Sequence, residues 1–329
     1  MKMPRLNAVL YKDMQQKVKR ANFAISLLVI NGLMFLVALC VIAAMFGNNY
    51  YYSNIDNQML IYLFIGLIVA ECVFICFAIP SFTAGSISGE REKQTLDVLL
   101  TTKMSPWEIV KGKFMSSISQ ILMVMITGLP IFALVFIYGG ITFLQMLAVL
   151  VVIMIGSMYM ASFGVYFSAA LKKTLNATVL TYLSLVLLFL GTILVTVLPI
   201  ALMEVLNEYI YYLNHGSYNY QATPDYINLD WLSFFLYANP LTTVFDAIGT
   251  IFGGGSGYND VCMASLINEI TDYSRDNILL KYWSVIGSVV QLGLTYVNLK
   301  FAARVLNPLR KKKVKVKGAR HERKGSKNS

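Results

Sequence analysis

The sequence predicts an all-α membrane protein in which six helices cross the bilayer. Hydrophobic residues make up 57% of the 329 residues and charged residues only 13%, whereas soluble proteins carry roughly 25% charged residues. Six apolar stretches approach or exceed the length of about 20 residues that a helix needs to span a bilayer. Lysine and arginine gather in alternate connecting segments. Each apolar stretch must be helical, because lipid offers no hydrogen-bond partners to exposed backbone groups.

The predicted spans are residues 23–46, 60–82, 116–138, 143–171, 177–203 and 282–306. The first span is too long for the core of a cleaved signal peptide, which has about 7–15 apolar residues. Before it, Leu6, Leu10, Met14 and Val18 recur every four residues among lysines. This pattern predicts a short elbow helix at residues 6–20 that lies in the membrane interface. The alternative is an ordinary basic flank without a helix.

The distribution of basic residues predicts that both termini are cytoplasmic. Lysines and arginines precede span one, join spans two and three, join spans four and five, and follow span six. The opposite side holds only Arg275 and Lys281, and positive charge marks the cytoplasmic side. The net charge of +10 therefore reports topology, and we expect no nucleic-acid partner. We expect a multi-pass protein of the plasma membrane of a bacterium.

The two segments outside the spans differ in character. Residues 310–329 form a basic tail with almost no apolar residues, for which we expect disorder and attraction to anionic lipid. The permease domain then covers residues 1–309, with residues 204–281 as its long external segment. Within that segment residues 231–252 are apolar, but Asn239 and Pro240 suit a helix cap and a first helical turn. We therefore expect two short re-entrant or surface helices before span six rather than a seventh span.

The most informative stretch follows span two on the cytoplasmic side. It contains an acid–arginine–acid cluster followed by apolar residues at helical spacing. The cluster is Glu90, Arg91 and Glu92, and the apolar residues are Leu96, Leu99 and Leu100. We interpret this as a short amphipathic helix that lies across the inner face. It either docks into the groove of another protein or rests on the lipid headgroups.

The same stretch resembles the signature of type-2 ATP-binding-cassette permeases. The matching positions are Ser86-Ile87, Glu90-Arg91-Glu92, Thr95-Leu96 and Leu99, and residues 105–113 are similar to the family's segment before span three. In that family this stretch is a coupling helix that contacts the ATPase subunit. The resemblance implies that Glu90, Arg91, Glu92, Thr95, Leu96, Leu99 and Leu100 carry the ATPase contact here.

No nucleotide site of its own is expected in this chain. A phosphate-binding loop needs the spacing G-x-x-x-x-G-K-[ST], and the candidate at Gly112-Lys113 lacks the first glycine and the final hydroxyl residue. We therefore expect a transport subunit that is no enzyme and binds no cofactor. ATP and Mg²⁺ would sit on a separate ATPase, and a second permease subunit, identical or different, would complete the transporter. The family's range of substrates implies an exporter of an amphipathic, lipid-like, drug, peptide or ion substrate.

One acidic residue, Glu71, lies near the middle of span two. An ionisable residue at this depth is costly and usually faces the interior of the helix bundle or a water-filled space. Glu71 is therefore either a residue of the transport path or a neutral packing residue. Two other functions stay open, an ion-coupled secondary transporter and an intramembrane enzyme. No metal site is expected, because the four cysteines lack ligand spacing and His215 and His321 lie outside the spans.

Overall fold

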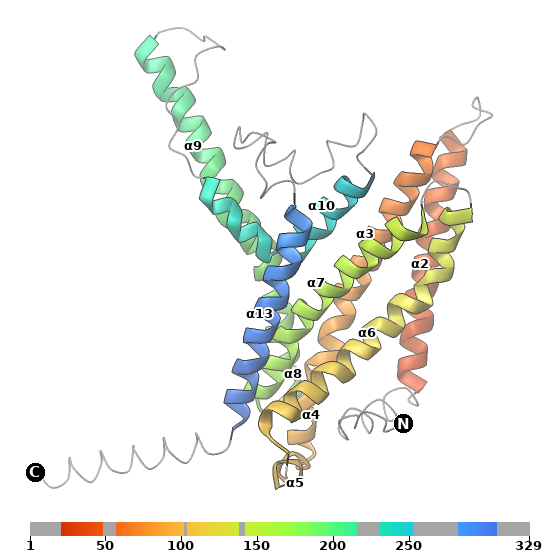
Figure 1. The fold of residues 1–329 in the computed structure, drawn as a ribbon, viewed down its shortest axis with the longest axis vertical. Helices are drawn as coiled ribbons and strands as arrows, with labels where there is room; N and C mark the ends of the chain where they lie inside the picture. The colour runs from red at the N-terminus through yellow and green to blue at the C-terminus, as the bar shows by residue number, and fades with distance from the viewer. Residues whose placement is uncertain are drawn as a thin grey trace, which may run out of the picture.

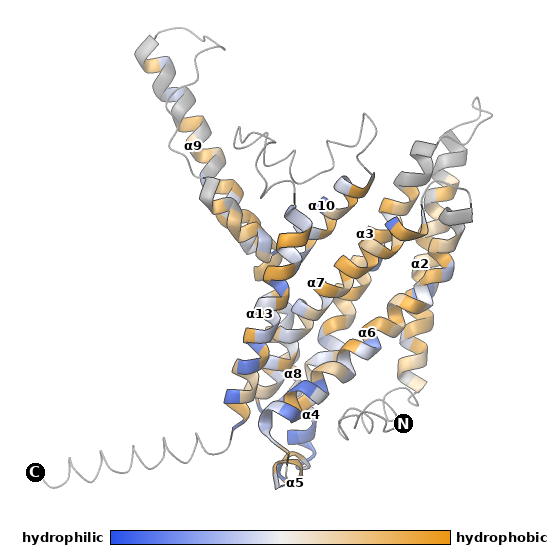
Figure 2. Cartoon of the chain, viewed as in Figure 1, coloured by the Kyte–Doolittle hydropathy of each residue, from blue (hydrophilic) through white to orange (hydrophobic). Residues whose placement is uncertain are grey.

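The computed structural model describes residues 21–48, 57–101, 104–137, 142–215, 230–252 and 282–307, and all of its regular elements there are helices. Within these ranges six helices are long and apolar enough to cross a membrane, in agreement with the six predicted spans. Hydrophobic residues occupy most of the length of these helices (Figure 2). The predicted elbow at residues 6–20 and the tail at residues 310–329 lie outside the described residues.

The first four spans are long helices separated by short connections. They are α2 (Ala21–Asn48), α3 (Asn57–Thr83), α6 (Pro106–Ile137) and α7 (Phe143–Ala170). Span six is α13 (Trp283–Leu306), which packs along α7. Between α3 and α6 lie two short helices, α4 (Gly85–Glu92) and α5 (Leu96–Thr101). Figure 1 shows α4, α5, the start of α2 and the end of α13 at the same end of the bundle.

Helix α6 begins ten residues before the predicted start of span three. Ser105 and Glu108 form a reciprocal cap: the Ser105 amide donates to Glu108 Oε2 over 2.8 Å, and the Glu108 amide donates to Ser105 Oγ over 3.3 Å. Pro106 occupies the first helical position, where its missing amide hydrogen costs nothing. The cap outweighs the polar composition of this turn, so the helix extends beyond the apolar stretch.

Span five is interrupted by a turn of π-helix. It runs through α8 (Thr174–Val186), the π-helical turn η1 (Leu187–Gly191) and α9 (Thr192–His215). A π-helical turn has a different hydrogen-bond pattern from the α-helices that flank it. Here the carbonyl of Phe189 and the hydroxyl of Thr192 accept hydrogen bonds from Asn239 Nδ2 over 3.2 and 2.9 Å. The apolar composition of residues 177–203 predicted one continuous helix and gave no sign of this turn.

Among the described residues of the segment before span six there are two short helices. They are a 3₁₀-helix, η2 (Asp230–Ala238), and α10 (Pro240–Phe252). Asn239 Oδ1 accepts the amide of Leu241 over 2.9 Å, which confirms the predicted cap and places Pro240 in the first turn. Asp246 of α10 in turn accepts the amide of Ser284 over 2.9 Å, at the start of α13. The pair of short helices is thus joined to both span five and span six.

Candidate functional site

The candidate site lies at the α5 end of the bundle and is built on α4. Helix α4 follows α3 almost directly, since the Ala84 amide donates to the carbonyl of Pro80 over 2.9 Å. Its start has no side-chain cap of its own. The hydroxyl of Ser168, on α7, accepts the amides of Ile87 and Ser88 over 2.8 and 3.0 Å instead. A side chain from a neighbouring span therefore satisfies backbone donors that a helix start leaves open.

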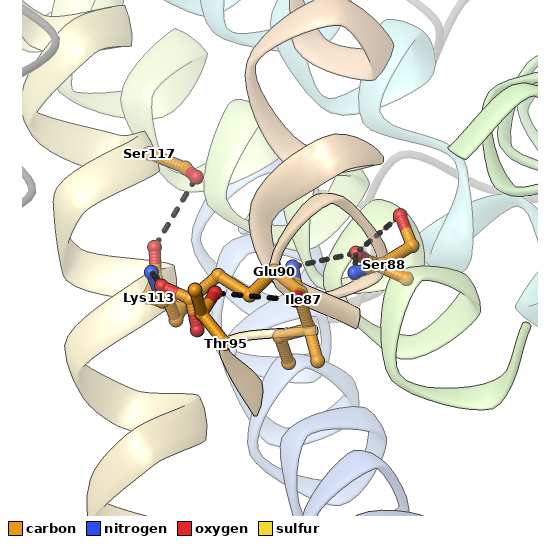
Figure 3. Close-up of polar contacts among 7 residues, drawn as sticks. Ile87, Ser88, Glu90, Thr95, Lys113 and Ser117 are labelled. Atoms are coloured by element: carbon orange, nitrogen blue, oxygen red, sulfur yellow. Dashed lines mark hydrogen bonds and ion pairs between the residues drawn. The ribbon is translucent and has the colours of Figure 1, made fainter. Parts of the chain in front are cut away.

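Glu90 joins α4 to α6 through an ion pair. Its Oε1 atom lies 2.5 Å from Lys113 Nζ (Figure 3). The Lys113 side chain is only 4% exposed, and the Glu90 side chain is 24% exposed. The second carboxylate oxygen of Glu90 is buried and has no hydrogen-bond partner among the described residues. The pair thus places an acidic partner beside a buried lysine, and a buried charge is costly unless it is paired.

Arg91 and Glu92 join α4 to the junction between α7 and α8. The Arg91 guanidinium donates to the carbonyls of Leu171 and Ala169, the latter over 3.0 Å. Glu92 accepts the amide of Thr174 over 2.7 Å and its hydroxyl over 2.9 Å. A cation therefore sits at the carboxyl end of α7 and an anion at the amino end of α8, which is the favourable arrangement for both helix dipoles.

A tight turn ends α4 and separates it from α5. The Thr95 amide donates to the Glu90 carbonyl over 2.9 Å, and the Gln94 amide donates to the Arg91 carbonyl over 3.1 Å. This pair of bonds is the Schellman motif, in which the residue after the cap takes a left-handed conformation. Gln94 does so with φ of 58°. The sequence predicted one amphipathic helix here, and that prediction is corrected to two helices separated at residues 93–95.

Helix α5 presents its leucines to the bundle rather than to the exterior. Leu96 is buried, and Leu99 and Leu100 are half-buried against the main apolar core. The other face of the helix is open, with Asp97 and Thr101 exposed and Val98 68% exposed. An external protein would therefore meet this second face, and the leucines would support it from behind.

The structure brings the predicted charged residues together but keeps Glu71 apart. Glu71 lies in the middle of α3, against Gly128 of α6, about 19 residues before Glu90. Three residues that bind α4 were not foreseen from the sequence: Lys113, Ser168 and Thr174. The visible signals are the second of two lysines in the first turns of α6 and the threonine that follows Lys172 and Lys173. Among the described residues no three His, Cys, Asp or Glu side chains gather as metal ligands do.

Sequence comparison agrees with this arrangement. No curated protein matches the sequence. One family model, described as ABC-2 family transporter protein, matches residues 6–302, which is most of the chain and includes every helix of the candidate site. The six spans, the short helices α4 and α5 after the second span and this match agree, and the chain belongs to the ABC-2 transporter family as a multi-pass membrane component.

Proposed function

We propose that this chain is the membrane subunit of an ATP-driven exporter and that a separate ATPase docks on α5. The observation that carries the proposal is the different bonding of the two short helices. Helix α4 is bonded to α6, α7 and α8, whereas α5 leaves Asp97, Val98 and Thr101 exposed. The exposed face of α5, where a partner could bind, is thus adjacent in the chain to α4. Helix α4 is in turn connected to four spans: it follows α3 and is bonded to α6, α7 and α8.

The charged cluster would act as a set of internal connections rather than as the docking surface itself. A displacement of α5 passes through the turn at Gln94 into α4, and then into α6 through Glu90 and into α7 and α8 through Arg91 and Glu92. Because packed helices move as rigid units between discrete arrangements, such connections would convert nucleotide-driven motion of a partner into a rearrangement of the spans. In this proposal Glu90, Arg91 and Glu92 transmit force, and Thr95, Leu96, Leu99 and Leu100 hold α5 in place.

The remaining features of the transporter follow from this placement. The α5 end would be the cytoplasmic face, with both termini on it and the basic tail attracted to anionic lipid. Two permease subunits would pair, and ATP and Mg²⁺ would bind to the partner ATPases. The substrate would be an amphipathic, lipid-like, drug, peptide or ion species, for which family membership is the support. The same membership favours this function over a secondary carrier or an intramembrane enzyme.

Co-purification with the ATPase expressed from the same operon or locus tests the docking surface. Val98→Asp places a charge on the exposed face of α5 without touching the core. We expect it to weaken retention of the ATPase by roughly tenfold, or about 1.4 kcal/mol. The double substitution Glu90→Ala with Arg91→Ala should also reduce retention while membrane insertion stays intact. Lys300→Ala, at an exposed position on α13, is the control, and undiminished retention by both test variants would contradict the proposal.

A further inference from the structure

Glu71 is a buried carboxyl in the middle of a membrane span. It lies 14 residues from the start of α3 at Asn57 and 12 residues from its end at Thr83, or about 20 Å along the helix from either end. The side chain is 1% exposed. Its Oε1 atom has no hydrogen-bond partner among the described residues. None of the bonds that fasten α4 to the spans involves Glu71.

The Glu71 carboxyl lies against the backbone of α6. A Cβ atom placed on Gly128 would lie 3.3 Å from Glu71 Oε2 and 3.9 Å from the carboxyl carbon. The first of these distances is shorter than ordinary carbon–oxygen contact, so glycine is the residue that lets the carboxyl rest against α6. Residues one helical turn away on the same two helices, Ile68, Ile75 and Met125, belong to the main apolar core. With Glu71 only 1% exposed, solvent has almost no access to the seam between α3 and α6 in this conformation.

No counter-charge lies at this depth among the described residues. The described parts of α2, α7 and α8 contain no Asp, Glu, Lys or Arg. The charged residues of α6 are Glu108, Lys111 and Lys113, and even the nearest is 15 residues, or about 22 Å, from Gly128 along the helix. On α4 the charges begin at Glu90. The other titratable groups of the surrounding helices whose side chains the structure describes are thiols and phenols, namely Cys40, Cys72, Cys76, Tyr159, Tyr166 and Tyr182.

We propose that Glu71 is a proton-binding site within the membrane and that it carries a proton in this conformation. An unpaired charge in an apolar medium costs far more than an unpaired neutral hydroxyl or carbonyl. With no cation within reach and one oxygen unbonded, the neutral acid is the form that this seam accommodates. The ligand is thus a proton, taken from hydronium by the carboxylate to give the carboxylic acid and water.

The same geometry couples the proton to the packing of α3 against α6. Ionisation of Glu71 requires water at the carboxyl, and water reaches it only if α3 and α6 separate near Gly128. Loss of the proton and opening of the seam therefore form one equilibrium. The inference concerns the permease chain alone and does not depend on the docking of an ATPase at α5.

Solid-state NMR of the full chain in lipid bilayers tests the proposal. Glutamate labelled with ¹³C at the carboxyl carbon reports whether each side chain is a neutral acid or a carboxylate. We expect the signal that disappears in Glu71→Gln to have the shift of a neutral acid at neutral pH, whereas the exposed Glu92 gives a carboxylate signal. If Glu71→Gln does not fold, Glu71→Asp assigns the same signal. A carboxylate shift for Glu71 at neutral pH overturns the proposal.

A second measurement separates a neutral acid from a carboxylate paired with an unseen cation. Glutamine reproduces the shape and polarity of the neutral acid, so Glu71→Gln should melt within about 2 °C of the unaltered chain, a difference of roughly 1 kcal/mol. Glu71→Lys at the same position is the contrast and should lose the folded state. A Glu71 signal that moves with Na⁺ or K⁺ concentration at constant pH would also overturn the proposal, because the ligand would then be a metal ion.

Discussion

The ion pair between Glu90 and Lys113 is the connection of α4 whose contribution can be measured most cleanly. Glu90→Gln keeps the size of the side chain and removes its charge, which takes the Glu90 carboxylate away from the buried ammonium of Lys113. Removal of one member of a buried pair costs about 3–5 kcal/mol. Because the Glu90 side chain is 24% exposed and water screens part of the loss, we expect about 3 kcal/mol, the lower end of that range.

The reverse substitution should cost less. Lys113→Met removes the cation and leaves Glu90, whose side chain is 24% exposed and can turn toward water, so we expect about 2 kcal/mol. The double variant has neither charge and should lose only about 3 kcal/mol in total instead of the sum of about 5. The interaction energy from this double-mutant cycle is then about 2 kcal/mol. At about 2 °C for each kcal/mol, Glu90→Gln alone should lower the melting temperature by about 6 °C.

Thermal unfolding of the purified chain in detergent, followed by tryptophan fluorescence, gives the four melting temperatures of the cycle. Lys111→Met, at an exposed position on the same helix, is the matched control and should leave the melting temperature nearly unchanged. The coupling should persist at high salt, since a buried pair is screened little. Additive effects of the two single substitutions, within about 0.5 kcal/mol, would refute the reasoning.

Three further predictions follow from the described contacts. Gln94→Gly should slow amide exchange in α4, because it relieves a left-handed conformation that costs a non-glycine residue about 1 kcal/mol; Gln94→Ala should give no such gain. Asn239→Leu removes the hydrogen bonds to the Phe189 carbonyl and to the first turn of α10, a loss of about 2 kcal/mol, and should lower the melting temperature by about 4 °C. Asn239→Asp should restore only the cap of α10. Gly164→Ala should destabilise the chain by about 1–3 kcal/mol, because its Cβ would lie 1.9 Å from Thr83 Oγ1. Gly293→Ala, with open space around it, is the control. Equal melting temperatures for the two variants would contradict the close packing of α3 on α7.

The helices were predictable because the signals that define them are local or compositional. Six apolar stretches gave the spans, and the Asn239-Pro240 pair gave the start of α10. The break between α4 and α5 was missed, because a glutamine in the left-handed conformation is rare and Gln94 carries no sequence mark of it. The start of α6 was placed too late, because composition outweighed the cap formed by Ser105 and Glu108.

The candidate site was predictable in composition but not in geometry. The sequence shows the charged cluster at residues 90–92 and the apolar spacing of α5. The orientation of these two helices, however, depends on contacts with residues about 20 to 80 positions away. Lys113, Ser168 and Thr174 bind α4 from three other helices, and no local pattern reports such pairings. The π-helical turn at residues 187–191 could not be predicted for the same reason, because Asn239, its hydrogen-bond partner, is distant in the chain.

Site-specific photo-cross-linking at Val98 tests the central claim most directly. A photoreactive amino acid at this position, on the exposed face of α5, should yield a light-dependent adduct with the ATPase in membranes of the native host. The adduct should be labelled by an azido analogue of ATP and should contain a peptide with the phosphate-binding loop. The same amino acid at Val289, 65% exposed on α13 and far from α5, should give no such product. An adduct without an ATPase at Val98, or equal ATPase adducts at both positions, would contradict the account.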